Sequence, residues 1–167
     1  MGFESFQIEL SGGKVNQARA VDLLRAYPNV RLDPNGIPLT GSTYFVMNDG
    51  LHVVEIEIKD YSPLRVSCRF MLCHPPSIDV AFLSFVRGLM VALQMDATIR
   101  DDVSPVQSGP YSLAQFAEFS AAATRCIAKR RNEWIAQFGT EQLAASSKDV
   151  YEKIILPQCQ PAASTMR

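Results

Sequence analysis

Two neighbouring segments of the chain, 51–59 and 64–73, alternate between two kinds of side chain with a period of two residues. On one face the first segment carries His52, Val54, Ile56 and Ile58, and the second carries Leu64, Val66, Cys68, Phe70 and Leu72. Such alternation is typical of antiparallel strands that pack one face on a core and expose the other to water. We therefore predict an antiparallel sheet with one apolar face and one wet face.

The turn before the first of these segments predicts a hairpin. Residues 43–47 are rich in β-forming side chains, and the sequence Asn48-Asp49-Gly50 that follows is a strong signal for a tight turn. We expect 43–47 and 51–59 to pair across this turn, with 64–73 as the next strand of the sheet.

Two more strands are predicted nearer the ends of the chain. Phe6, Ile8 and Leu10 alternate with polar residues, and 97–100 is a short segment before a stretch rich in proline, glycine and serine. The whole sheet is then expected to have about four to five strands.

Three segments carry apolar residues at helical spacing. The first, 14–27, ends before Pro28, because the residue before a proline disfavours the helical conformation. The second is the most strongly patterned, and Ser77 stands where its N-cap is expected. Its stripe is formed by Ile78, Phe82, Phe85, Val86, Leu89, Met90 and Leu93. The third, a long helix, is predicted to begin at a capping box formed by Ser112 and Gln115.

Beyond the long helix, Gly139 is expected to end it, and Thr140 to cap a last helix that runs toward Pro157. The order of elements predicts an α+β two-layer sandwich, with helices on one face of the sheet and an extra long C-terminal helix. We expect a single domain at 1–157 and a flexible tail at 158–167.

Composition excludes several classes of protein. Of 167 residues, 47% are hydrophobic and 20% charged, with a net charge of −1, so the chain is not of the disordered type and has no general attraction for nucleic acid or membrane surfaces. The first residues do not form a signal peptide, and four cysteines without a secretory address are expected to be reduced. These features predict a cytoplasmic protein.

Catalytic and metal sites find little support in the sequence. Cys73 and His74 are adjacent and could line a pocket mouth, but neighbours on an extended chain point apart, so we expect a loop-end cysteine beside a solvated histidine. His52 is expected to be hydrogen-bonded and partly buried. No spacing of cysteines or histidines matches a metal site, and we predict neither a metal nor a cofactor.

Two short motifs are interpreted structurally. The segment 11–14, Ser-Gly-Gly-Lys, lacks the spacing of a phosphate-binding loop, so its glycines are expected to form a tight turn. The basic run at 129–131 is expected to be a solvated helix face, because a net charge of −1 gives no supporting field for nucleic acid.

The wet face of the sheet carries the remaining functional signal. Glu55 and Glu57 on one strand are expected to lie beside Arg65 and Arg69 on the next. Cross-strand charge pairing alone could explain them. Alternatively, they form a polar platform that binds a partner, with arginines suited to recognising carboxylates.

With no catalytic group identified, the sequence favours a non-catalytic cytoplasmic domain that binds a protein partner through Glu55, Glu57, Arg65 and Arg69. An inhibitor or immunity-type protein that docks onto a toxin or effector would be an example, by analogy of fold alone. Two alternatives remain open. One is a small-molecule enzyme or ligand binder with a pocket between sheet and helices near Cys73 and His74, and the other is an obligate homodimer.

Overall fold

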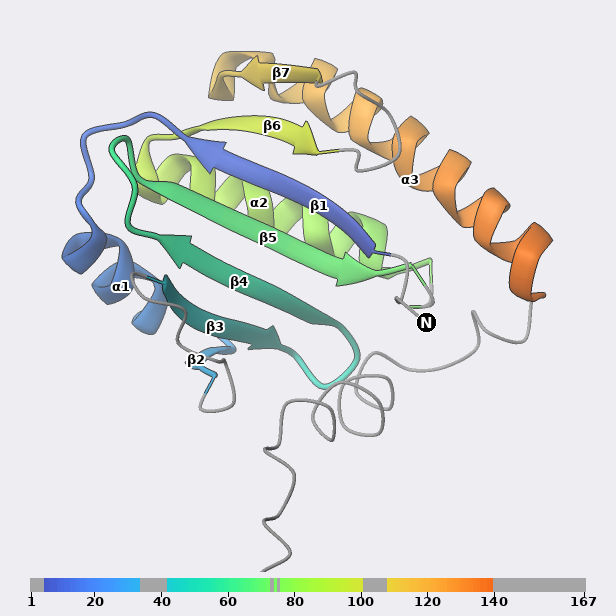
Figure 1. The fold of residues 1–167 in the computed structure, drawn as a ribbon, viewed down its shortest axis with the longest axis horizontal. Coiled ribbons are helices and arrows are strands. Elements are labelled where there is room, and N and C mark those ends of the chain that lie inside the picture. Colours follow the sequence, from blue (N-terminus) through green and yellow to red (C-terminus); the bar gives the residue numbers. More distant parts are fainter. Residues whose placement is uncertain (1–4, 34–41, 73, 75, 101–107, 140–167) are drawn as a thin grey trace, which may run out of the picture.

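The computed structural model describes residues 5–33, 42–72, 74, 76–100 and 108–139. Its elements follow one another as β1 (Ser5–Ser11), α1 (Gln17–Arg25), β2 (Val30–Leu32), β3 (Ser42–Asn48), β4 (Val53–Lys59), β5 (Arg65–Met71), α2 (Ile78–Leu93), β6 (Asp96–Arg100), β7 (Ser108–Tyr111), a 3-10 turn at Leu113–Gln115 and α3 (Phe116–Phe138). The strands form one antiparallel sheet in the order β2-β3-β4-β5-β1-β6-β7 (Figure 1).

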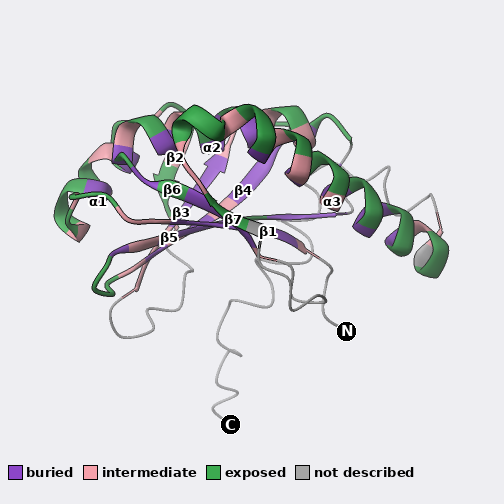
Figure 2. Cartoon of the chain, turned by 90° about the horizontal axis from the view of Figure 1, so that it is seen from above, coloured by how far each residue is buried: buried purple, intermediate pink, exposed green. Residues whose placement is uncertain are grey.

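The molecule has two layers. All three helices lie on the same side of the sheet, with α2 behind its central strands (Figures 1 and 2). We call this the covered face, and the opposite one, which carries no helix among the described residues, the open face. The predicted α+β sandwich with a long C-terminal helix is confirmed, although the described sheet has seven strands and not four to five. None of the helices in the described ranges is long and apolar enough to cross a bilayer.

The hydrophobic core fills the space between α2 and the covered face. The helical stripe predicted from 78–93 is buried, including Phe82, Phe85 and Leu89. Phe82 packs on Phe70 of β5 with ring centroids 4.8 Å apart, and on Phe6 of β1 at 6.1 Å. The period-2 pattern of the strands and the helical pattern of α2 therefore meet in one core, as the sequence indicates.

Register places the predicted partners side by side. Glu55 pairs with Arg69 across β4 and β5, and Lys59 pairs with Arg65. On the other side of β5, β1 pairs Gln7 with Arg69. Because the apolar residues between these positions are buried on the covered face, a shift by one residue would expose them, and burial therefore fixes this register.

Several boundaries differ from the sequence prediction. Strands β2 and β7, which lie at the two edges of the sheet, were not predicted. Strand β2 has only three residues, and β7 contains a proline, which is tolerated in an edge strand but argues against a strand in the sequence. Strand β4 begins at Val53, two residues later than expected, because 49–52 form a loop. The last helix predicted from Thr140 and the tail at 158–167 lie outside the described residues.

Candidate functional site

The open face carries a network of charged and polar side chains across its central strands. Its members include Gln7, Glu9, Glu55, Glu57, Lys59, Arg65, Ser67, Arg69 and Arg100. All four residues predicted to form a platform, Glu55, Glu57, Arg65 and Arg69, project from this face. The structure thus brings them together on one surface, where their role as a partner site remains a prediction.

Ion pairs join neighbouring strands on this face. The Arg69 guanidinium donates to Glu55 Oε2 from both Nε, at 2.7 Å, and Nη2. Glu9 Oε1 accepts from Arg100 Nη2 at 2.5 Å and lies 3.6 Å from Arg65 Nη1. Two sheet neighbours of β1 therefore both supply an arginine to one carboxylate.

Glu57 is the third carboxylate of the open face. Its Oε1 accepts from the hydroxyls of Ser42 and Tyr44, each at 3.0 Å, and its Oε2 lies 3.3 Å from Lys59 Nζ. Burial raises the pKa of Tyr44, and the hydrogen bond to and negative charge of Glu57 add to that rise. The hydroxyl of Tyr44 therefore keeps its proton at neutral pH and donates it to the hydrogen bond with Glu57.

In each of these ion pairs the cation is the more exposed partner. The Arg69 side chain is 46% exposed and that of Glu55 21%, while Arg65 is 41% exposed and Glu9 11%. The same order holds in the two other pairs, Arg100 with Glu9 and Lys59 with Glu57. A molecule that approached this face would meet guanidinium and ammonium groups before the carboxylates beneath them.

The open face is not uniformly wet, contrary to our expectation. Glu9, Ser67 and Thr98 are buried there. So are three apolar residues, Val46, Val53 and Met71, which stand outside the main core cluster.

A second polar cluster lies at the end of the β3–β4 hairpin, where this loop meets the start of α2. His52 Nδ1 is 2.9 Å from Asp49 Oδ2, and His52 Nε2 is 2.9 Å from Ser77 Oγ. Carboxylate, imidazole and hydroxyl thus form a continuous hydrogen-bonded chain, which we call the Asp49–His52–Ser77 chain.

The loop itself fixes the carboxylate of this chain. Asp49 Oδ1 accepts from the backbone N–H of Leu51 at 2.9 Å and of His52 at 2.7 Å. Burial alone would raise the pKa of Asp49, but the hydrogen bonds from the His52 side chain and from these two N–H groups outweigh it and lower that pKa. The carboxylate is therefore ionised and aimed at the imidazole.

Ser77 was predicted to have a different role from the one it has in the Asp49–His52–Ser77 chain. We expected Ser77 to cap α2, yet its side chain makes no capping hydrogen bond and its backbone is helical, not extended. An N-cap serine contributes about 0.5–2 kcal/mol to a helix. Here the exposed hydroxyl of Ser77 turns to His52 instead. The sequence shows Asp49 as a turn residue and Ser77 as a cap, and only the fold reveals that His52 joins them.

The expectation that His74 is solvated is wrong, while the alternative pocket predicted at Cys73 and His74 remains a prediction. Cys73 lies outside the described residues. His74 is 1% exposed, not solvated, and its Nε2 lies 3.2 Å from the Val53 carbonyl oxygen, to which it donates. Burial lowers the pKa of His74 to about 4, so the ring is neutral in ordinary buffers. The ring packs near Phe70 and belongs to the core side of the sheet.

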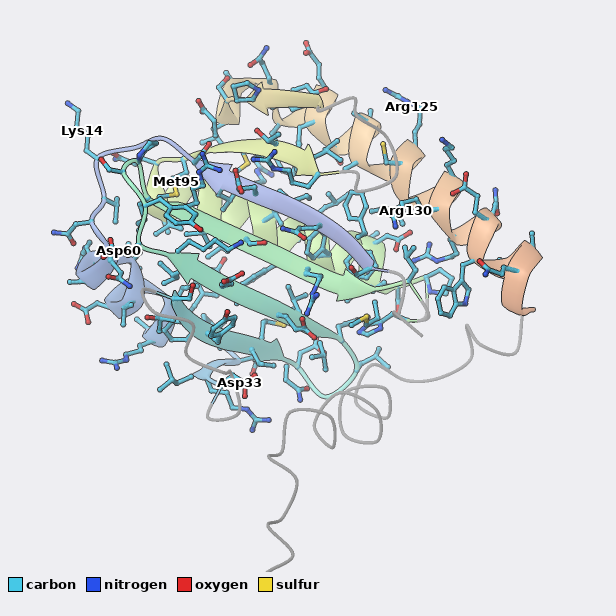
Figure 3. The ribbon with its side chains drawn as sticks, in the orientation of Figure 1. Lys14, Asp33, Asp60, Met95, Arg125 and Arg130 are labelled. Carbon is cyan, nitrogen blue, oxygen red and sulfur yellow. The ribbon has the colours of Figure 1, made fainter. Side chains whose placement is uncertain are left out.

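The basic run on α3 also differs from its prediction. Lys129 is exposed as expected, but Arg130 and Arg131 are buried. Arg131 makes two hydrogen bonds to the carboxylate of Asp79 in the first turn of α2, at 2.5 and 2.7 Å. Figure 3 shows Arg125 projecting outward from α3, whereas Arg130 lies on the side toward the sheet. Helix packing thus buries two of the three residues that were predicted to form a solvent-exposed face.

Cysteine and glycine residues in the described ranges have structural roles. Cys68 and Cys126 are free thiols, and burial raises the pKa of Cys68 to about 12. Gly12 and Gly13 both have positive φ angles, as expected of a tight turn.

Within the ranges that the structure describes, no three Asp, Glu, His or Cys side chains gather in a way that could hold a metal ion.

Comparisons with known proteins add no assignment, because no protein-family model, no curated protein and no solved structure matches the chain.

Proposed function

We propose that this chain is a protein-binding domain whose open face docks onto an acidic surface of its partner. The observation that carries the proposal is the order of exposure in the ion pairs: Arg65 and Arg69 lie outermost, above recessed carboxylates. The recessed carboxylates hold the guanidinium groups in place, so little side-chain entropy remains to be lost on binding. Arginine also forms paired hydrogen bonds with carboxylates, which favours an acidic partner over an apolar one.

This chemistry agrees with the class suggested by the sequence, a domain that docks onto a toxin or effector, provided that the partner presents carboxylates. Charge complementarity across such an interface speeds association and disfavours wrong partners. It also makes binding weaker at high salt, because salt screens exposed charges.

The test is capture of partners on immobilised protein, followed by mass spectrometry, with wild type and three charge-reversal variants. Arg65→Glu and Arg69→Glu change the open face, and Lys129→Glu changes an exposed residue of α3 as a matched control. We expect a partner that binds wild type and Lys129→Glu, is lost with both open-face variants, and binds less as salt rises. All variants should melt near the wild-type temperature.

If Arg65→Glu and Arg69→Glu both capture as much partner as the wild type does, the open face is excluded as the binding surface. Loss of capture with all three variants would show a general charge effect, and that would also count against the proposal.

A further inference from the structure

The hydrogen bonds of the Asp49–His52–Ser77 chain determine where its protons lie. An ionised carboxylate can only accept, so His52 Nδ1, 2.9 Å from Asp49 Oδ2, carries the proton of the neutral ring. His52 Nε2 is then the acceptor, and the Ser77 hydroxyl, 2.9 Å away, donates to it. A hydroxyl that donates to an oriented imidazole is ready to lose its proton to that imidazole.

Exposure differs between the members of the Asp49–His52–Ser77 chain in a way that suits a reaction at Ser77. His52 is buried, whereas Ser77 is exposed and its hydroxyl has no role in capping α2. The reacting residue therefore lies at the surface, and the base behind it is shielded from water.

The start of α2 is where negative charge would develop in such a reaction, and the N–H of Ile78, directly after the serine, is the donor closest to it in sequence. Helix α2 begins at Ile78, directly after the serine. The first N–H groups of a helix have no acceptor within that helix, but here the N–H of Asp79 already donates to the Pro76 carbonyl oxygen at 3.1 Å. The N–H of the residue after a nucleophilic serine is one of the donors that stabilise the oxyanion in hydrolases of unrelated fold.

We propose that Asp49, His52 and Ser77 form an acyl-transfer site that hydrolyses small carboxylic esters, with Ser77 Oγ as nucleophile, His52 as general base and Asp49 as a positioning residue. A nucleophile hydrogen-bonded to a base, which a third group orients, is the geometric signature of this chemistry and does not depend on the order of residues in the chain. The site lies toward the helices, so the inference is independent of partner binding on the open face.

The reaction balances without an oxidant, a metal or a co-reactant other than water. Ser77 Oγ attacks the carbonyl carbon of the ester while its proton passes to His52 Nε2. The bond from carbon to the alkoxy oxygen then breaks, and the alcohol leaves with that proton, so that an acyl group stays on Ser77. Water, deprotonated by His52, attacks the acyl carbon, and the carboxylic acid leaves as Ser77 regains its proton.

The experiment uses the full chain, a fluorophosphonate probe that forms a covalent bond with activated serines, and p-nitrophenyl acetate as the ester. We expect one probe molecule per chain, located on Ser77 by peptide mass spectrometry, and turnover of the ester. The same chain unfolded in urea should not react, which tests the need for the fold without any substitution.

Variants assign the roles. Ser77→Ala should abolish labelling and turnover, while Ser84→Ala, which changes another exposed serine in the middle of α2, should leave both unchanged. His52→Gln should slow labelling at least 100-fold, since general-base catalysis contributes about 10²–10⁴ to a rate.

Asp49→Asn should slow labelling and also change the ¹⁵N NMR signals of the His52 ring, because the proton no longer resides on Nδ1. The NMR change shows that Asp49 sets the position of the proton on His52, and slower labelling together with it shows that this position matters to the reaction. If native wild type labels Ser77 no faster than unfolded chain does, or if His52→Gln labels at the wild-type rate, the proposal is wrong.

Discussion

The covered and open faces of the sheet are built from alternate residues of the same strands, yet different interactions hold them. On the covered face Ile56 and Phe70 belong to one buried hydrophobic core together with residues of α2. On the open face their neighbours Glu55 and Arg69 form an ion pair whose arginine is almost half exposed. Burial of apolar area contributes about 25 cal/mol per Å², whereas an exposed ion pair contributes about 0–1 kcal/mol.

This difference separates stability from recognition in one element. The covered face determines which residues of each strand point to solvent, because a slip in register would expose the core. The exposed charges of the open face, such as Arg69, can then change at little cost to folding, whereas the buried Glu9 cannot. The predictions below test that division, beginning with the covered face.

Leu89 of α2 is 1% exposed, and we expect Leu89→Ala to lower the free energy of unfolding by roughly 2–5 kcal/mol, since it removes buried methyl groups and leaves a cavity. Urea denaturation measures this loss. The control is Val91→Ala on the same helix, at a side chain that is 55% exposed, which should change stability by about 0.5 kcal/mol or less. Equal effects of the two substitutions would mean that α2 does not bury the predicted stripe.

The buried imidazole of His74 makes the covered side sensitive to acid. Its pKa is lowered from 6.5 to about 4, so the unfolded chain binds a proton more readily than the folded one does. Its contribution to stability is complete above pH 6.5 and is lost as the pH falls toward 4, amounting to about 2–3 kcal/mol between pH 7 and 4.5. Urea denaturation at both pH values should show this loss, and His74→Gln should reduce it. An unchanged loss in the variant would assign the sensitivity to other groups.

The turn between β1 and α1 tests how closely the backbone packs at the edge of the covered layer. A Cβ on Gly13 would lie 2.7 Å from the Gln94 carbonyl oxygen, whereas one on Gly12 would have no heavy atom within 4 Å. Both residues have positive φ, which costs an L-residue about 1–2 kcal/mol. Gly12→Ala should therefore cost about 1 kcal/mol and Gly13→Ala about 2–3 kcal/mol by denaturation, with the difference due to the clash. Equal costs would place the strain in φ alone.

The periodicity of the sequence was sufficient to predict the architecture. The period-2 pattern around Val54 and Val66 and the helical stripe around Phe82 each indicated a face that must be buried, and only a sheet covered by helices buries both. The edge strands were missed because β2 has three residues and β7 contains Pro110, so neither shows a repeating pattern. A hydrophobic pattern is informative only where a strand or helix is long enough for the pattern to repeat within it.

For the candidate sites too, the sequence predicts proximity only where a repeating pattern determines the direction of the side chains. The four platform residues Glu55, Glu57, Arg65 and Arg69 could be placed on one surface because strand alternation determines side-chain direction. The Asp49–His52–Ser77 chain could not, because His52 and Ser77 are 25 residues apart and meet only through the packing of a loop on the start of a helix. The buried Arg131 was missed for a similar reason, since its partner Asp79 lies on another helix.

The smallest effect that we predict is on the open face, in the pair of Glu55 and Arg69. We expect a double-mutant cycle with Glu55→Ala and Arg69→Ala to give a coupling free energy of about 1 kcal/mol or less, because water screens a pair whose arginine is 46% exposed. Urea denaturation of the wild type, both single variants and the double variant measures this coupling, which should fall further in 0.5 M salt. A coupling above about 2 kcal/mol, unchanged by salt, would mean that the pair is shielded from water as a core residue is. The open face would then share the stabilising role of the covered face, and its charges would no longer be available to a partner.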